Sequence, residues 1–403
     1  MTDVSLFDMA AADTCVSCGL CLPHCPTFRL TGDELYSPRG RLAAMTAVTQ
    51  GIVAVDAEFD DSLSTCLGCR ACEAVCPGLV PYGPLFEAAR ANLTAEQPTA
   101  GRTARRFLLG RWLAWRPGMR IVTAIGAIAQ RFRLGRFMPG FARRGLTGLR
   151  PLAKKGPSWV GRTVEAVGPS RGTVAVLAGC VMDQWFGGVH AAAAAVLSRA
   201  GYRVVFPAGQ TCCGALAAHD GQVAAAQRLA GRNAAAFADA DLVVADAAGC
   251  SAHLKEYGRW TERGEALGAK VRDVTELVAS LIAEGALPTV TEHRGTVAVQ
   301  DPCHLRHAQR ITAQPRAILE AAGLDVVEID VDGLCCGAAG IYSVTHPQTS
   351  EELGRRKASQ VVASGAAVVA SANPGCEMQL RAYLPPGIRI AHPVELYDEA
   401  ITS

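Results

Sequence analysis

Sixteen cysteines are the residues of this 403-residue sequence whose type and spacing could do chemistry. Eight form two copies of the pattern C-x-x-C-x-x-C-x-x-x-C-P: Cys15, Cys18, Cys21, Cys25 and Cys66, Cys69, Cys72, Cys76. Zinc sites usually present their ligands as two separated pairs, whereas three thiolates at successive i, i+3 spacing surround three corners of a 4Fe-4S cluster. The first residues lack a signal-peptide pattern, so we expect a cytoplasmic chain with reduced thiols. The pattern predicts iron–sulfur clusters rather than zinc or a disulfide knot.

The fourth cysteine of each motif follows the third by four positions and lies on a departing segment, so it points away from its own loop. In two-cluster ferredoxins this cysteine ligates the other cluster. We therefore expect two 4Fe-4S clusters with crossed ligands: Cys15, Cys18, Cys21 and Cys76 for one, and Cys66, Cys69, Cys72 and Cys25 for the other. Neither site is complete until both halves fold together, which places the two clusters within reach of electron transfer.

The stretch between the two motifs predicts a helix that starts near the clusters. Ser37 and Pro38 indicate a turn followed by a helix, and the next residues have helical spacing of their apolar side chains. Arg39 and Arg41 then lie in the first turn. Either they stabilise reduced clusters or dock an acidic partner, or they are ordinary surface residues.

The other eight cysteines form a second duplicated pattern: Cys180, Cys212, Cys213, Cys250 and Cys303, Cys335, Cys336, Cys376. The first interval is 32 residues in both halves, and the halves are offset by 123 residues. Equal intervals indicate an internal repeat. Each half also alternates apolar strands with helices, with strands expected at 173–179, 202–208, 241–247, 296–301, 325–331 and 366–373.

Ligands of an open parallel sheet gather at the carboxyl ends of its strands. All four cysteines of each repeat lie at or just beyond such ends, which favours a binding function over a purely structural one. The predicted fold is α+β combined with α/β. It has a helical two-cluster ferredoxin-like domain at 1–98, a basic helical linker at 99–168, and two repeated α/β domains with parallel sheets at 169–290 and 291–403.

The linker has an unusual charge pattern. No Asp or Glu occurs between Glu96 and Glu165, while fifteen Lys and Arg residues occur there, interleaved with tryptophan and phenylalanine. Such a segment suits an anionic membrane surface or an acidic partner subunit, with a solvated linker as the alternative. Its longest apolar run, 121–129, has nine residues, less than half a bilayer span. We expect peripheral membrane contact rather than a transmembrane helix, and no nucleic-acid binding.

With both cysteine systems located, the sequence resembles the glycolate oxidase iron–sulfur subunits over its whole length. The resemblance rests on the two ferredoxin motifs, the spacer TGDELYSPRGR and two cysteine-rich CCG domains at 180–250 and 303–376. More distant relatives with this domain order are subunits of the lactate-utilisation and anaerobic glycerol-3-phosphate dehydrogenase systems. Heterodisulfide reductase subunits share the CCG domains.

The resemblance implies an electron-transfer subunit of an oxidoreductase that acts on the CH–OH group of a 2-hydroxy acid. FAD-containing partner subunits would oxidise glycolate. This chain, with no flavin and no catalytic residue of its own, would pass the electrons to a quinone or another membrane acceptor, in the cytoplasm or on the cytoplasmic face of the inner membrane. The alternative is a lactate-utilisation, glycerol-3-phosphate dehydrogenase or heterodisulfide-reductase-like complex with chemistry at the CCG sites.

The cysteine-rich domains depart from those of heterodisulfide reductase, in which the module ends in C-x-x-C. Here His253 and Gln379 stand three residues after Cys250 and Cys376, so each module has four cysteines. Four thiolates suffice for an ordinary 4Fe-4S cluster, and His253 could add to the first site. Two possibilities stay open: a further cluster in one or both domains, or a cluster-free docking or quinone-facing site. For His253, His304 and His307 we expect a polar core or capping role.

Overall fold

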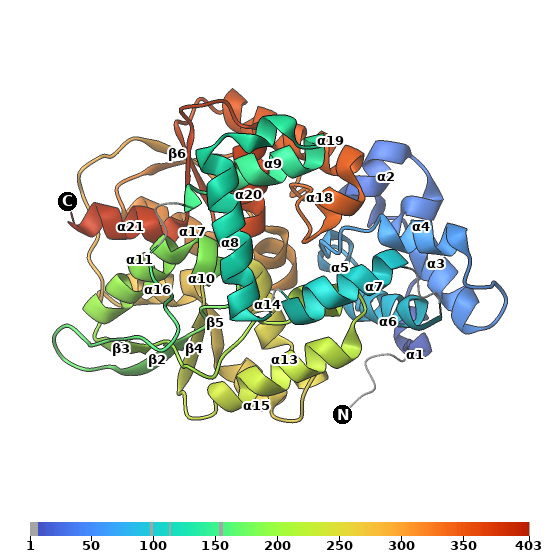
Figure 1. Cartoon of the computed structure of the whole chain (residues 1–403), viewed down its shortest axis with the longest axis horizontal. Helices are drawn as coiled ribbons and strands as arrows, with labels where there is room; N and C mark the ends of the chain where they lie inside the picture. Colours follow the sequence, from blue (N-terminus) through green and yellow to red (C-terminus); the bar gives the residue numbers. More distant parts are fainter. Residues whose placement is uncertain (1–6, 97–99, 113, 153–155, 403) are drawn as a thin grey trace.

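The computed structural model describes residues 7–96, 100–112, 114–152 and 156–402. Figure 1 shows the N-terminal helices in blue, beside the two sheet-containing parts of the chain. The N-terminal part consists of α1 (Met9–Ala12), α2 (Pro26–Thr31), α3 (Pro38–Thr49), α4 (Ala57–Ser64), α5 (Ala71–Ala74) and α6 (Tyr82–Glu96). It is helical, as the sequence predicted.

Helix α3 begins where the sequence predicted. The Ser37 side chain accepts a hydrogen bond from Gly40 N (2.9 Å), and Pro38 occupies the first helical position, where its missing N–H costs nothing. Asp56 caps α4 in the same way by accepting from Phe59 N (2.9 Å). These helices and α6 pack around one apolar core that includes Leu42, Met45, Phe59, Leu63, Leu85 and Phe86. This core supports the two cysteine loops.

The basic segment is helical over its described residues. It contains α7 (Ala100–Phe107), the π-helical η3 (Leu108–Trp112), α8 (Arg116–Arg131), the 3-10 helix η4 (Leu134–Phe137) and α9 (Gly140–Gly148). Figure 1 shows α8 upright in the middle of the molecule, with α9 at its upper end. Trp185 Nε1 donates to Thr123 Oγ1 (2.9 Å), and Arg116 donates to Gln210 O (2.5 Å), so one side of α8 is fixed to the following domain. None of the described helices is both long and apolar enough to cross a membrane.

The first sheet contains the strands β1 (Thr163–Val164), β2 (Gly172–Val176), β3 (Tyr202–Val205), β4 (Leu242–Ala245) and β5 (Val271–Asp273). Their order is β1-β3-β2-β4-β5, and all pairings are parallel except β1 with β3. Its helices are α10 (Val181–Trp185), α11 (Gly187–Arg199), α12 (Ala215–His219), α13 (Val223–Ala236), α14 (Ala248–Lys255), α15 (Gly264–Lys270) and α16 (Val274–Ala283). The three predicted strands are present. The antiparallel β1 was not predicted and lies in the expected linker, because two residues show no periodicity.

The second sheet contains β6 (Thr296–Gln300), β7 (Asp325–Glu328), β8 (Val368–Ser371) and β9 (Arg389–Ala391), all parallel, in the order β7-β6-β8-β9. Its helices are the π-helical η7 (His304–Ala308), α17 (Ala313–Ala321), α18 (Tyr342–Thr345), α19 (Pro347–Ala363), α20 (Pro374–Tyr383) and α21 (Pro393–Thr402). The order matches β3-β2-β4-β5 of the first sheet, so the internal repeat is a repeat of fold.

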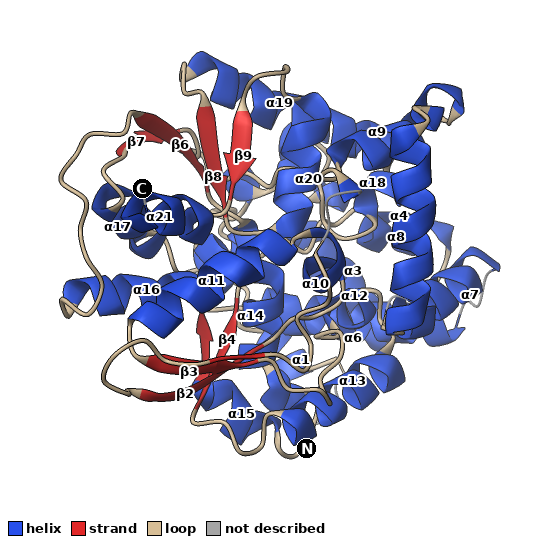
Figure 2. Ribbon diagram, turned by 60° about the vertical axis from the view of Figure 1, so that its left-hand side comes forward, coloured by secondary structure: helices blue, strands red, loops and turns tan. Residues whose placement is uncertain are grey.

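The two sheet-containing halves share one hydrophobic core. Helices α17 and α21 of the second half pack against α16 and α11 of the first, and Figure 2 shows these four helices between the two sheets. Ile318 and Tyr397 are fully buried in the same cluster as Val196 and Leu281. Burial of such side chains stabilises each by about 1.5 to 3 kcal/mol. The halves therefore form one rigidly packed body that holds their cysteines in a fixed relation.

Candidate iron–sulfur and cysteine-rich sites

The first site combines cysteines from both ferredoxin motifs. Cys25, Cys66, Cys69 and Cys72 line one small cavity of about 20 Å³. Burial raises the pKa of the Cys69 and Cys72 thiols, and the neighbouring thiols raise it further. Gly68 adopts φ +60°, a left-handed conformation that favours glycine, and its N–H donates to the Cys66 sulfur (3.4 Å). Four thiols and a backbone donor fit the ligand set of a 4Fe-4S cluster.

A buried cation accompanies this thiol set. Arg41 is 1% exposed, its Nε donates to Ser62 O (2.7 Å), and its Nη2 donates to Thr27 Oγ1 (3.1 Å). Its Nη1 lies 3.9 Å from the Cys25 sulfur. Because Arg41 is inaccessible, neither a docking function nor an ordinary surface role applies to it. Its buried positive charge instead lies beside the Cys25 sulfur.

The second set of ferredoxin cysteines is closer to solvent. Cys18 is exposed, and burial raises the pKa of Cys21 to about 11. Gly78 brings the loop of Cys76 against the first motif: a Cβ on Gly78 would stand 2.7 Å from Thr14 O and 3.8 Å from the Cys76 sulfur. The loop that follows Cys76 thus lies against the residue that precedes Cys15. Ligation of a second cluster by Cys76 together with Cys15, Cys18 and Cys21 stays a prediction.

The cysteine-rich domains hold their thiols at the carboxyl ends of the strands. Cys180 lies beyond β2, Cys212 and Cys213 beyond β3, and Cys250 in the first turn of α14, beyond β4. The sulfurs of Cys180 and Cys212 are 3.4 Å apart, and further thiol contacts continue from Cys212 through Cys213 to Cys250. The second domain repeats this arrangement with Cys303, Cys335, Cys336 and Cys376.

Both cysteine-rich sets face one cavity of about 400 Å³, which Cys66 and Gly68 of the ferredoxin part also line. All sixteen cysteines lie in the described residues as free thiols. Among the described residues, no three His, Cys, Asp or Glu side chains converge on a point suited to a single metal ion. Four thiols in each domain match the ligand number of a 4Fe-4S cluster.

A buried carboxylate, that of Glu87, lies where the ferredoxin part meets the first cysteine-rich domain. It accepts hydrogen bonds from an imidazole and from a guanidinium group. His219 Nδ1 donates to Glu87 Oε1 (2.9 Å) and Arg259 donates to Glu87 Oε2 (2.7 Å). Burial alone would raise the pKa of Glu87, but these partners lower it to about 2. Neither Glu87 nor His219 was singled out from the sequence. They carry no motif, and only the packing of α6 on α12 brings them together.

The three histidines considered from the sequence have different surroundings. Burial lowers the pKa of His253 and of His304 to about 3, so both rings are neutral. His304 Nε2 donates to Gly68 O (3.1 Å), which ties the second cysteine-rich domain to a ferredoxin loop. His307 Nε2 donates to Gly333 O (2.9 Å). His253 Nε2 is buried without a hydrogen-bond partner, beside Gly214 of the cysteine loop.

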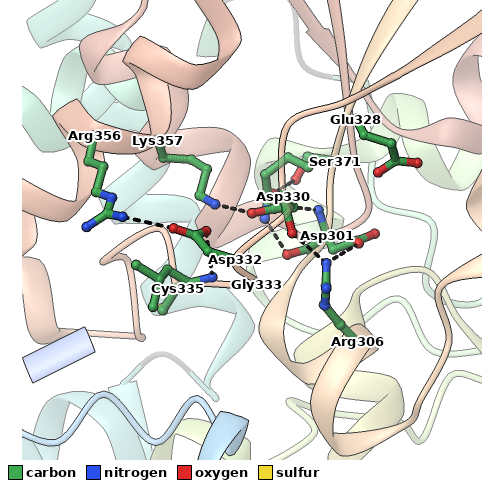
Figure 3. A network of polar contacts seen from close by, with 12 residues as sticks. Asp301, Arg306, Glu328, Asp330, Asp332, Gly333, Cys335, Arg356, Lys357 and Ser371 are labelled. Atoms are coloured by element: carbon green, nitrogen blue, oxygen red, sulfur yellow. Dashed lines mark hydrogen bonds and ion pairs between the residues drawn. The ribbon is translucent and has the colours of Figure 1, made fainter. Parts of the chain in front are cut away.

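The second domain has a buried ionic network next to its cysteines (Figure 3). Lys357 donates to the Asp330 carboxylate, and Asp301 N donates to Asp330 Oδ2 (2.7 Å). The Asp301 carboxylate in turn binds Arg306 (3.1 Å) and Arg316 (3.0 Å). Burial raises the pKa of Asp330 to about 6, against the opposing effect of Lys357. The network fixes the ends of β6 and β7, from which the loops of Cys303 and Cys335 depart.

Comparison with known proteins agrees with these sites. Residues 11–80 match the 4Fe-4S dicluster domain, and residues 174–255 and 297–381 match the cysteine-rich domain CCG. The chain is 34% identical to the probable glycolate oxidase iron–sulfur subunit of Bacillus subtilis (strain 168) and 30% identical to the glycolate oxidase iron–sulfur subunit of Escherichia coli (strain K12). Each of these alignments covers 96% of this chain and 93% of the relative.

Partial relatives also occur. Lactate utilization protein A of Shouchella clausii (strain KSM-K16) is 30% identical over 51% of this chain and 89% of its own length. The full-length similarity is therefore to the glycolate oxidase subunits, and the similarity to the lactate protein covers half of the chain. With its two ferredoxin motifs and paired cysteine-rich domains, the chain belongs to the family of glycolate oxidase iron–sulfur subunits, as the resemblance predicted.

Proposed function

We propose that this chain is the electron-transfer subunit of a glycolate oxidase complex. It takes electrons from an FAD-containing partner subunit and passes them towards a quinone or another membrane acceptor. The observation that carries this proposal is the contact between cysteine sets: Cys69 packs in one apolar cluster with Cys335, and Cys303 packs against the same cluster. Thiols of the ferredoxin part and of the second cysteine-rich domain thus lie side by side, which supports a chain of redox centres.

The proposed clusters have crossed ligands. Cys25 joins Cys66, Cys69 and Cys72, and Cys76 joins Cys15, Cys18 and Cys21. The cavity shared by the first four supports this assignment. When bound, each 4Fe-4S cluster supplies a one-electron carrier. The protein's own contribution is to bury Cys25 and Cys69, to hold the Arg41 cation beside Cys25, and to leave Cys18 exposed to solvent.

We propose further clusters in one or both cysteine-rich domains, held by Cys180, Cys212, Cys213 and Cys250 and by Cys303, Cys335, Cys336 and Cys376. A second candidate function has a specific observation in its favour: the shared cavity is of a size that binds small molecules. In that case the complex performs chemistry on a disulfide or a quinone between the two thiol sets.

Iron content separates these candidates. Anaerobically purified protein with about eight irons carries the two ferredoxin clusters only, and about twelve or sixteen irons means occupied cysteine-rich sites.

Cys25→Ser is expected to perturb the EPR signal of the Cys66 cluster, and Cys76→Ser that of the Cys15 cluster. The opposite outcome refutes the crossed assignment. Purified chain mixed with glycolate and a dye acceptor should show no turnover, and turnover without a flavoprotein contradicts the subunit function.

The exposed face of α8 supports peripheral membrane contact. Ile121, Ile125, Ile128 and Phe132 follow helical spacing on one side of α8 and its end, with exposed fractions of 48, 61, 54 and 61%. Exposed arginines flank this face at 120, 131, 133 and 136. An amphipathic helix with arginines beside an outward apolar stripe lies in the interface of an anionic membrane. We propose that α8 makes this contact.

Vesicle binding tests the contact. The double change Ile125→Glu and Ile128→Glu should lower the bound fraction on vesicles that contain anionic lipid by roughly tenfold or more, because it places two charges at the apolar boundary. Val362→Glu is the matched control, since Val362 is also exposed but lies on α19. Binding of the wild-type chain should weaken in salt. Equal binding by the α8 variant, or binding that salt does not weaken, assigns the basic segment to a protein partner instead.

A further inference from the structure

A second, larger groove lies away from the cysteine cavity. It has a volume of about 810 Å³ and runs between the ferredoxin part and the second cysteine-rich domain. One wall comes from residues next to cluster ligands: His24 precedes Cys25, and Val75 precedes Cys76. The two proposed clusters therefore approach the surface along this wall. None of the functions derived above uses the groove.

The groove is strongly basic. Arg29, Arg306 and Arg310 line it together with two histidines, and Asp332 is the acidic residue among its lining residues. Asp332 is already bound to Arg29 (3.3 Å) and to Arg356 (2.9 Å), as Figure 3 shows for Arg356. Arg306 is fixed by Asp301 and by Asp330 O (2.7 Å). These bonds hold the side chains of the wall in place, so its positive charges have fixed positions.

Arg310 stands out among these cations. It is exposed, and within the described part of the chain its side chain has no hydrogen-bond or ion-pair partner. Its φ is +57°, a conformation that is uncommon for any residue with a side chain. The chain needs this conformation because Ile311 turns back into the core and donates to Leu305 O (2.9 Å) after η7. Glycine adopts this φ without strain, so Arg310→Gly would remove the cation and keep the backbone conformation.

We propose that this groove is the docking site for an acidic face of the flavin-containing partner subunit, with Arg310 as its free cation. The inference rests on the proposed function, since it supplies the surface through which electrons enter. Electron-transfer partners associate through small, electrostatically steered surfaces, and a basic groove beside both cluster loops meets that need.

The test uses a flavoprotein that co-purifies with the wild-type chain and is identified by its flavin absorbance. Its binding to immobilised chain is measured across salt concentrations. Arg310→Gly should weaken binding by about twofold to fivefold at low salt and Arg310→Glu by more, with little difference at high salt. Because glycine prefers a positive φ, Arg310→Gly should retain wild-type iron content and thermal stability. Reduction of the clusters by the reduced flavoprotein should slow in parallel.

Arg263→Glu is the control, because Arg263 is exposed in the first cysteine-rich domain, away from the groove lining. Different outcomes contradict the proposed function and the proposed docking site. If no flavoprotein accompanies the wild-type chain, the proposed function itself is wrong. If the flavoprotein binds the wild type and both Arg310 variants equally, or if Arg263→Glu weakens binding as much as Arg310→Glu, the groove is not the docking site.

Discussion

The two cysteine-rich domains share a strand order and a cysteine pattern, but their surroundings differ. In the first domain neutral donors hold the adjacent cysteines, with Asn233 donating to Cys212 O (3.0 Å) and Tyr257 to Cys213 O (2.6 Å). A buried pair of His190 and Asp246 lies at the strand ends. Around the second set the neighbours are ions, with Lys357 and Asp330 both buried. The thiols thus have the same positions in both repeats, but the side chains that hold their loops differ.

The cysteines of the two domains also have different neighbours. Those of the second domain pack against the ferredoxin loop of Cys69. In the first domain, Cys180 and Cys212 line a small cavity with Arg116 at the start of α8. Away from the cysteines, both domains contact both other parts of the chain: α20 of the second packs on α9 of the basic segment, and Arg259 of the first donates to Glu87 of the ferredoxin part. The difference between the repeats is therefore confined to the surroundings of the thiols.

The largest expected effect comes from the ionic network of the second domain. Lys357→Met leaves Asp330 without its counterion in a buried site, and we expect a loss of about 3 to 5 kcal/mol in the free energy of unfolding at pH 8. The loss should shrink as the pH falls towards 6, because the buried Asp330 of the variant then takes up a proton. Anaerobic urea titrations at several pH values measure both. Asn233→Ala, the counterpart in the first domain, should cost about 1 to 3 kcal/mol, with no pH dependence over that range.

A somewhat smaller effect is expected where the ferredoxin part meets the first domain. The pKa of Glu87 is lowered to about 2, below its ordinary value of 4.5. Glu87 therefore contributes stability that is present above pH 4.5 and lost as the pH falls towards 2, and Glu87→Gln should cost about 3 kcal/mol at neutral pH. Between pH 8 and 5 the cost of Glu87→Gln should not shrink, because its partners Arg259 and His219 do not lose positive charge as the pH falls, whereas the cost of Lys357→Met should shrink. If the costs of Glu87→Gln and Lys357→Met change with pH in the same way, the predicted difference between the two sites is wrong.

The smallest effect concerns the contact between the ferredoxin part and the second domain. Tyr342 donates to Thr65 O (2.9 Å), a neutral bond beside an apolar cluster. Tyr342→Phe should cost about 0.5 to 1.5 kcal/mol, and salt should not change that cost. Tyr397→Phe is the matched control, since Tyr397 donates to Pro288 O (2.6 Å) between the two cysteine-rich halves. If added salt lowers the cost of Tyr342→Phe, an ionic interaction contributes to the contact between the ferredoxin part and the second domain.

Prediction from the sequence succeeded where the pattern is local. The start of α3 at Pro38, the helical basic segment and the strands that precede the cysteines were all predicted. The short strands β1, β5 and β9 were missed, because two or three residues carry no periodicity. For Arg41 the sequence allows a role beside the clusters, a docking role or an ordinary surface role, and its burial excludes the last two. A first-turn residue can face solvent or core, and only the packing of α4 and the cysteine loops covers this one.

By itself, the sequence determined the type of site and the repeat of fold. Thiol spacing is a local property, because residues three positions apart in a loop must stand close whatever surrounds them. Only the tertiary structure decided which thiol sets meet. Cys69 and Cys335, or Glu87 and His219, are far apart along the chain and become neighbours through packing of α6 and of the ferredoxin loops on the paired domains. No pattern along the chain encodes that packing, because it depends on the shapes of whole surfaces.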